Sequence, residues 1–386
     1  MSPDPDRPTG RPDHEASYDE VRRVLVIRAL PGLGDMLCAA PALRALRTAC
    51  PQADLALLGL PGASEVLARS GHHVDRVLPF QGWPGIPEGP ARCPGEGADA
   101  ADGWAPVDLG VAYAGLVALQ RERFDLVLQL HGDGSVTNQL ALAVGGRHTA
   151  GFHASSAPAP GTGTFHPYPD DLHEIHRQTR LLELLGMPLD GDHLEMSVSD
   201  DDRRRARDVV GSAWSAPYVC LHPGASCPNR RWPPERFAAV GDALARQGIA
   251  VVLTGSPGEA TLTAAVAAAM AEPSIDVAGR LTLGPLAALL QQARLAVTND
   301  TGTSHLSVAV RVPSVVVFGG PDPSDPRRWA PLDTDRHRAV VPAGPGWPES
   351  AEVVDQAHDL LSRPVAAHSD RVGRAGEDGT GRAELL

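Results

Sequence analysis

The stretch Leu295–Val310, LAVTNDTGTSHLSVAV, constrains the fold more tightly than any other part of the chain. It begins as an apolar run typical of a buried strand, passes through the polar turn Asn299–Thr303, and continues as a helical pattern from about Ser304. A helix that starts directly after a strand offers unpaired amide groups and the positive end of its dipole, which together attract phosphate. Gly302 lets an anion approach the backbone closely. The stretch therefore predicts either a phosphate-binding site or an ordinary capped helix start.

Asp300 is the unexpected residue of this turn. A carboxylate beside a phosphate repels the anion unless its oxygens point elsewhere. The hydroxyl groups of a sugar attached to the phosphate would be suitable partners for it. We therefore expect a nucleotide-sugar diphosphate as the ligand of this turn.

Short apolar strands alternate with helical patterns along most of the chain, for instance with helices over Asp35–Ala49 and Glu235–Gln247. This alternation predicts an α/β fold with parallel, doubly wound sheets. Because 386 residues exceed what one core usually organises, we expect two such domains with a ligand cleft between them. The predicted strands are Arg23–Leu30, Ala53–Gly59, Val74–Pro79, Phe124–Leu130, Tyr218–His222, Ala250–Leu253, Leu295–Thr298 and Ser314–Phe318.

The predicted domain boundaries follow from this pattern. We place an N-terminal domain at residues 21–200, a linker helix at 201–216, a C-terminal domain at 217–348 and a last helix at 349–363. Residues 1–20 and 364–386 lack hydrophobic periodicity, and we expect both tails to be disordered. The Gly- and Pro-rich stretches 81–107 and 155–169 predict surface loops.

Composition excludes several classes of function. A formal net charge of −13 argues against binding to nucleic acid and against unaided docking on anionic lipid. No run approaches the roughly 18 apolar residues of a membrane span, and the polar N-terminus does not resemble a signal peptide. We therefore expect a cytoplasmic protein with at most peripheral membrane contact.

The five cysteines are odd in number and include no CxxC pair, so they indicate neither a disulfide framework nor a zinc knuckle. Cys220, His222 and Cys227 lie close in sequence, but burial explains them better than a metal site.

The first strand is followed by the turn Gly32-Leu33-Gly34-Asp35 and a helical pattern. This is not a dinucleotide-binding fingerprint, because the third glycine and the acidic residue expected about twenty positions later are missing. A Rossmann dehydrogenase is therefore disfavoured. Asp35 either caps its helix or stands over the cleft as a general base.

Two loops of the second domain also follow strands. Leu221–Pro234, LHPGASCPNRRWPP, brings Arg230 and Arg231 to a helix start, where guanidinium groups could neutralise a diphosphate. Solvated surface arginines are the alternative interpretation. Thr254–Glu259, TGSPGE, follows the next strand. With the turn at Asp300, three polar loops converge on one crevice, which favours a binding site.

Four segments together resemble one known family. GLGDMLCAAPALRALR, LHPGASCPNRRWP, VVLTGSPGE and TNDTGTSHLSVAV are similar, in this order, to segments of the glycosyltransferase family 9 heptosyltransferases, which use ADP-heptose and lipopolysaccharide. FDLVLQLHG and HEIHRQTRLLELLGM are similar too, and the resemblance covers roughly Arg22 to Leu361. It implies a GT-B fold of two facing Rossmann-like domains, with the final helix packed back towards the first domain. It also implies inverting glycosyl transfer with neither a metal ion nor another cofactor.

The resemblance also implies roles for individual residues. Asp35 would be the catalytic base, and Arg230 falls where the family usually has a lysine that contacts the donor. Asp300 would bind donor-sugar hydroxyls. The remaining donor-binding residues would be Glu259 at the ribose, Leu281 with its backbone against the base, and Thr301, Gly302, Ser304 and His305 at the diphosphate. The acceptor-side loops would contribute Gly32, Gly34, His131 and Asp133.

The loop after FDLVLQL departs from the family. Members that use lipopolysaccharide-type acceptors tend to carry basic side chains there, whereas HGDGSVTNQLALAVGG has no Lys or Arg before Arg147. We therefore predict a neutral or cationic acceptor, such as a soluble amino-sugar or natural-product intermediate. Two alternatives stay open: a lipopolysaccharide core heptosyltransferase, and a catalytically silent partner subunit that binds a nucleotide sugar, which the arginine at 230 slightly favours.

Overall fold

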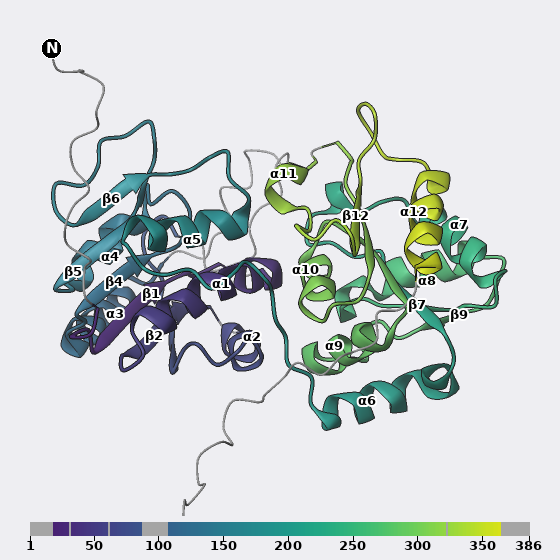
Figure 1. Cartoon of the computed structure of the whole chain (residues 1–386), viewed down its shortest axis with the longest axis horizontal. Helices are drawn as coiled ribbons and strands as arrows, with labels where there is room; N and C mark the ends of the chain where they lie inside the picture. The colour runs from purple at the N-terminus through teal and green to yellow at the C-terminus, as the bar shows by residue number, and fades with distance from the viewer. Residues whose placement is uncertain (1–17, 31, 61, 87–106, 322, 364–386) are drawn as a thin grey trace, which may run out of the picture.

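The computed structural model describes residues 18–30, 32–60, 62–86, 107–321 and 323–363, which form two lobes side by side (Figure 1). Each lobe contains a six-stranded sheet in which every pair of neighbouring strands is parallel. The strand orders are β3-β2-β1-β4-β5-β6 and β12-β11-β10-β7-β8-β9, so the second sheet repeats the order of the first. This is the doubly wound order of Rossmann-like domains. The predicted α/β class with two parallel sheets is confirmed.

The N-terminal lobe alternates strands and helices up to residue 184. Its strands are β1 Arg23–Ile27, β2 Asp54–Gly59, β3 Arg76–Pro79, β4 Leu126–Gln129, β5 His148–His153 and β6 Thr164–Pro167. Its helices are α1 Leu33–Ala49, α2 Ala63–Arg69, α3 Leu109–Glu122, α4 Thr137–Val144 and α5 Glu174–Leu184. The central strands are almost wholly apolar because helices cover both faces of the sheet.

The C-terminal lobe begins with α6 Asp200–Val210, which packs on α9 and so belongs to this lobe. Its strands are β7 Tyr218–His222, β8 Ala250–Leu253, β9 Ser274–Asp276, β10 Leu295–Asn299, β11 Ser314–Val317 and β12 His337–Val340. Its other helices are α7 Pro234–Ala245, α8 Ala260–Ala269, α9 Leu283–Gln292, α10 Gly302–Ala309, α11 Pro326–Trp329 and α12 Ser350–Ser362. Short 3-10 turns lie at Gly211–Ser215, Pro228–Arg230 and Pro257–Glu259.

Several expectations need correction. The final helix α12 packs against α7 and the sheet of its own lobe, so the expected return to the first domain is wrong. The stretch 155–169 contains β6, and the expected loop at 81–107 lies mostly outside the described residues. Tyr18, placed in the disordered tail, donates a hydrogen bond to the Leu185 carbonyl at 2.6 Å. The remaining tail residues, 1–17 and 364–386, lie outside the described part of the chain.

The buried apolar residues form three layers. One covers the α3 and α4 face of the first sheet, and another covers the α7 and α12 face of the second. The third and largest layer includes Met36 of α1 and Leu306 of α10, and it runs without a break from one lobe into the other. The lobes therefore share a core, and α1 and α10 lie against each other at their boundary (Figure 1). In the described part of the chain, no helix has both the length and the apolar character to cross a bilayer.

Candidate active site between the lobes

Two helix starts meet at the lobe boundary, because each follows a strand whose carboxyl end points towards the other lobe. A Cβ atom added to Gly34 of α1 would lie 2.6 Å from Cδ2 of His305 in α10. One added to Gly302 would lie 2.8 Å from the Cβ of Leu33 and 3.2 Å from the Gly34 nitrogen. Glycine at 34 and 302 thus allows the two helix starts to approach this closely. The predicted juxtaposition of the first-domain turn with the Asp300 turn is what the structure contains.

Asp35 is the third residue of α1 and is half-buried. No side chain caps α1, whose N-cap is Gly32, so the capping alternative for Asp35 does not hold. Its carboxylate lies over Gly32, where an added Cβ would be 2.2 Å from Oδ2. Burial raises the pKa of Asp35 above its usual value, although the guanidinium of Arg28 acts in the opposite direction. A carboxylate with a raised pKa is a stronger base than an exposed aspartate.

Arg28 supports the start of α1 from the end of β1. Its guanidinium is fully buried and donates hydrogen bonds to the carbonyl of Asp35 at 2.8 Å and to that of Leu130 at 2.6 Å. Glu174 of α5 lies 3.4 Å from the same guanidinium. Two backbone carbonyls and Glu174 take up the hydrogen-bond donors of the Arg28 guanidinium. Arg28 therefore holds the backbone of Asp35 in place and does not bind its carboxylate.

Glu174 also joins the lobes. Its Oε2 accepts a hydrogen bond from Arg328 of α11 in the other lobe at 2.9 Å. Beside this pair, His173 Nε2 lies 2.9 Å from the Ala330 carbonyl. Burial alone would raise the pKa of Glu174, but Arg28 and Arg328 outweigh burial and lower it. Sequence reasoning missed Glu174 and Arg328, because an acidic residue in a helix's first turn and an arginine in a polar stretch are ordinary features.

The turn after β10 has the properties expected of a phosphate seat. Thr301 is the N-cap of α10, and no side chain caps the helix. The Ser304 hydroxyl donates instead to the Thr301 carbonyl at 2.6 Å. The amides at the start of α10 are therefore left without a side-chain partner. Of the two interpretations of this stretch, a helix start capped by a side chain is thus excluded.

Asp300 and Arg230 lie beside this turn. Asp300 is mostly buried, accepts a hydrogen bond from the Ser324 hydroxyl, and has its Oδ2 3.9 Å from Nη1 of Arg230. Nε of Arg230 is buried and has no hydrogen-bond partner among the described residues. The Asp300 carboxylate is thus held by Ser324 and lies near the Arg230 guanidinium.

Buried polar side chains tie the loops of the C-terminal lobe together. The Asn299 amide accepts from the Trp232 backbone at 3.1 Å and donates to the Pro223 carbonyl at 2.7 Å. His222 lies 3.0 Å from the Thr254 hydroxyl and 3.1 Å from the Thr303 hydroxyl. These contacts join the loops after β7, β8 and β10 into one rigid edge.

Two cysteines of the second lobe, Cys220 and Cys227, lie near this edge. Cys220 is a buried free thiol, and Cys227 is disulfide-bonded, which the sequence analysis did not anticipate. The described residues contain no group of three His, Cys, Asp or Glu side chains placed to hold a metal ion.

Glu259 and Leu281 lie on the same edge of the second sheet. The Glu259 carboxylate accepts a hydrogen bond from the Ser256 backbone at 2.7 Å and faces Gly224, where an added Cβ would be 2.2 Å from Oε1. It therefore also caps its own turn. Leu281 is half-buried and packs against the shared core just before α9.

The loop after β4 contributes His131 and Asp133. His131 Nδ1 accepts a hydrogen bond from the Ala29 backbone at 3.2 Å, and burial lowers the pKa of His131 to about 4. The neutral ring thus holds the loop against the end of β1. The Asp133 carboxylate accepts from the Ser135 backbone at 3.0 Å and so stabilises its own turn.

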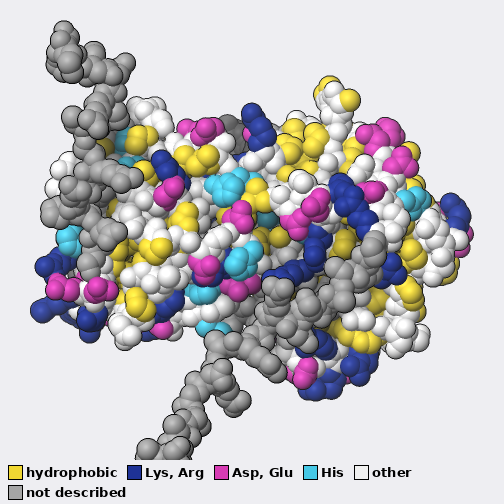
Figure 2. Space-filling view, viewed as in Figure 1, with side chains coloured by type: hydrophobic (Ala, Val, Ile, Leu, Met, Phe, Trp, Pro, Cys, Tyr) yellow, Lys and Arg dark blue, Asp and Glu magenta, His cyan; other side chains and the backbone are white. Residues whose placement is uncertain are grey.

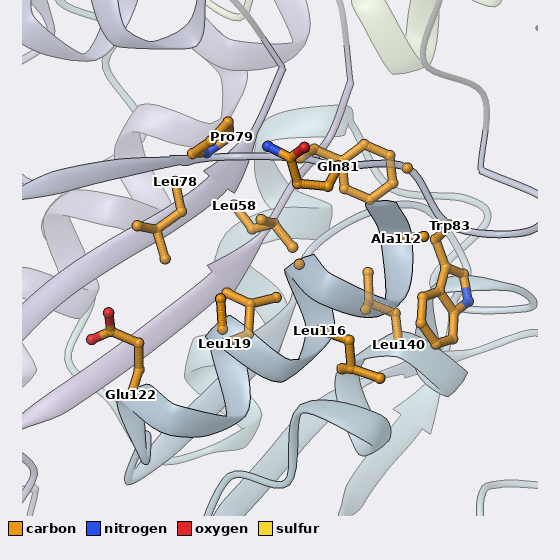
Figure 3. A pocket seen from close by; sticks show the side chains of 14 residues that line it. Leu58, Leu78, Pro79, Gln81, Trp83, Ala112, Leu116, Leu119, Glu122 and Leu140 are labelled. Carbon is orange, nitrogen blue, oxygen red and sulfur yellow. The ribbon is translucent and has the colours of Figure 1, made fainter. Parts of the chain in front are cut away.

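Three cavities accompany these residues. The first, about 170 Å³, lies between α3 and β3, where Leu116 and Leu119 face Leu58 and Leu78, and its lining includes none of the predicted site residues (Figure 3). The second, about 290 Å³, lies at the lobe boundary. Figure 2 shows histidine and acidic side chains gathered near this boundary. The third, about 280 Å³, borders Gly32. The lining of the second cavity includes His173, Asp192, His193, His305, Arg311, Asp333, Arg336 and His337.

Comparison with known proteins gives a consistent result. The profile described as glycosyltransferase family 9 (heptosyltransferase) matches residues 116–345, more than half of the chain. Lipopolysaccharide heptosyltransferase 3 of Escherichia coli K12 is 30% identical over 163 residues, which are 41% of this chain and 47% of that protein. The chain thus spans about half the length of this relative.

Two solved structures share the fold. A glycosyl transferase family 9 protein from Veillonella parvula superposes with a TM-score of 0.70 at 23% identity, covering 89% of this chain and 98% of that one. The E. coli heptosyltransferase WaaC with ADP-2-deoxy-2-fluoro heptose superposes with a TM-score of 0.61 at 21% identity, covering 88% and 98%. At these identities the likeness establishes the GT-B arrangement of the two lobes.

Proposed function

The chain belongs to glycosyltransferase family 9, and from this premise we propose that it transfers heptose from ADP-heptose to an acceptor hydroxyl, with inversion and without a metal ion or other cofactor. The observation that carries the proposal is the close approach of two helix starts, the one that carries Asp35 in the first lobe and the uncapped start of α10 in the second. An inverting displacement needs a base on one face of the anomeric carbon and a stabilised leaving group on the other. The two lobes supply one of these each.

The proposed reaction assigns a task to each side chain. Asp35 takes the proton of the acceptor hydroxyl while the hydroxyl oxygen bonds to the anomeric carbon. The bond from that carbon to the diphosphate breaks, and ADP leaves with the electron pair. Amides at the start of α10 and the positive charge of the Arg230 guanidinium stabilise the charge of the departing ADP. Asp300 orients the donor sugar through its hydroxyls.

The choice of ADP-heptose rests on the relatives. The protein that is 30% identical is named a heptosyltransferase, and the WaaC structure holds an ADP-heptose analogue. For the acceptor, our proposal departs from these relatives, because the loop His131–Gly134 offers an acidic residue, a neutral histidine and no Lys or Arg. We propose a neutral or cationic acceptor, such as a soluble amino-sugar or natural-product intermediate, in place of an anionic lipopolysaccharide core.

Calorimetric titration tests the donor. We expect ADP to bind more tightly than GDP, UDP or dTDP, and ADP-heptose to be consumed when an acceptor is added. Asp300→Ala should lower the affinity for ADP-heptose by about tenfold or more, because a hydrogen bond to a charged group is lost. The affinity for ADP should stay nearly unchanged. Asp300→Asn keeps an acceptor oxygen and should lose less. Equal losses for ADP and ADP-heptose would contradict the sugar contact, and consumption of no nucleotide sugar would contradict the function.

A further inference from the structure

The third cavity borders the turn that precedes the proposed base, and we call it the cleft cavity. It has a volume of about 280 Å³ and reaches Gly32, over which the Asp35 carboxylate lies. Its lining from the N-terminal lobe is Leu30, Gly32, Leu33, Met36, Leu60, Gly62, Ala63 and Val66, and Leu283 closes it from the other lobe. A molecule in this cavity would therefore touch both lobes and lie next to Gly32, the residue that the Asp35 carboxylate covers.

The wall of the cleft cavity is apolar. Every described residue that lines it is a glycine or carries a hydrocarbon or thioether side chain. Gly62 widens it further, because its left-handed backbone, with φ of 96°, disfavours a side chain and the space where one would stand is open. An apolar group of a ligand would be stabilised by burial against this wall, whereas a polar group would find no side chain for a hydrogen bond.

Two arginines that support the elements around this wall, Arg69 and Arg28, are already engaged. Arg69 binds Asp202 with both terminal nitrogens, at 2.7 and 3.1 Å, and packs against Gly284, the residue after Leu283. Arg28 is occupied by two carbonyls and Glu174. A phosphate or carboxylate placed in the cavity would lose water without gaining a free cation, which is strongly unfavourable.

We propose that the cleft cavity is the acceptor subsite and that it takes an uncharged acceptor with an apolar group next to the reacting hydroxyl, such as an alkyl glycoside, an aromatic glycoside or a deoxysugar. The proposal rests on the proposed function, because it assigns Asp35 to the acceptor hydroxyl. It narrows the acceptor from neutral or cationic compounds to those with a hydrocarbon face.

A homologous series of methyl to butyl β-D-glucosides tests the subsite. With the protein saturated with ADP, calorimetry should give a Kd that falls about fourfold for each added methylene until the cavity is filled. Glucose 6-phosphate should bind more weakly than methyl glucoside. A Kd independent of chain length, or tighter binding of the phosphate ester, would overturn the proposal. Because this measures binding, it stands apart from turnover: a slope without transfer would refute the function and keep the subsite.

Variants of Leu283 locate the effect. Leu283→Gln places an amide of similar size in the wall and should flatten the alkyl series, whereas Leu283→Met should preserve it. Leu283→Arg should make glucose 6-phosphate bind more tightly than methyl glucoside. If Leu283→Gln instead weakened the binding of ADP and left the dependence of Kd on alkyl chain length unchanged, the cavity would bind the donor and the proposal would fail.

Discussion

The two lobes share a strand order but differ in the chemistry of their facing edges. In the C-terminal lobe, Asn299 and His222 tie three strand-end loops together through buried hydrogen bonds. In the N-terminal lobe, the loops after β1 and β2 present glycine and leucine to the cleft. In the proposed function, the C-terminal edge would offer a preorganised polar surface to the charged diphosphate, and the N-terminal edge would select the acceptor by shape and apolar area. The same fold can therefore keep its donor and change its acceptor.

Asp35 places a carboxylate next to the apolar turns of the N-terminal lobe, and its removal should have the largest effect. Asp35→Asn keeps the shape of the side chain but cannot take a proton, so turnover should fall at least about a hundredfold while ADP affinity stays within about twofold. Steady-state rates and calorimetry measure the two quantities. Asp355→Asn, which changes an exposed carboxylate on α12, is the control and should behave as wild type. Normal turnover by Asp35→Asn would remove it as the base.

The fold was largely predictable because its central strands are long apolar runs. Tyr218–His222 and Ala250–Leu253 were predicted with the bounds that the structure has. The strands β5, β6, β9 and β12 were missed; they lie towards or at the sheet edges and mix polar with apolar residues. Such strands are held by pairing with a neighbour, which a local pattern does not reveal.

Helices were harder where their apolar pattern is atypical. No helix was predicted at α3, whose Leu109 and Tyr113 are exposed although both are apolar. The expected position of α12 came from the family resemblance, whereas its buried residues Val353, Ala357 and Leu360 pack on the C-terminal sheet. Periodicity predicts that a helix has an apolar face, but not which surface that face covers.

The site was predictable where one loop carries the chemistry. The turn at Asp300, the glycines 34 and 302, and Asp35 were found in sequence because strand–turn–helix segments place such residues at a sheet edge. The pair Glu174–Arg328 could not be found in this way. Its members are 154 positions apart, and only the packing of α11 on α5 brings them together.

Arg328 joins the two edges, and its loss should have the second largest effect. Arg328→Gln leaves the ionised Glu174 without its cross-lobe partner, so kcat/KM should fall about tenfold, with ADP affinity nearly unchanged. Arg328→Lys keeps the charge and should lose less. Arg327→Gln is the matched control, because Arg327 is exposed and pairs with Asp325 in its own turn. If the Arg327 and Arg328 variants were equally active, the bridge between the lobes would be irrelevant to catalysis.

The smallest predicted effect is a shift in pH dependence. Asp35 accepts a proton only when ionised, so kcat/KM should fall as pH drops through its pKa, which burial places above the usual aspartate value. The negative charge of Glu174 raises this pKa and the positive charge of Arg328 lowers it. Glu174→Gln should therefore move the acid limb to lower pH, and Arg328→Gln should move it to higher pH.

The opposite signs make this pair informative, because both variants break the same ion pair. If the pair only stabilised the lobe arrangement, both would lower the rate and neither would move the limb. Shifts in opposite directions, measured as pH profiles of kcat/KM, would mean that the polar contacts between the lobes set the charge state of the base at the apolar edge. Shifts in the same direction would contradict that electrostatic coupling and leave the pair a purely structural role.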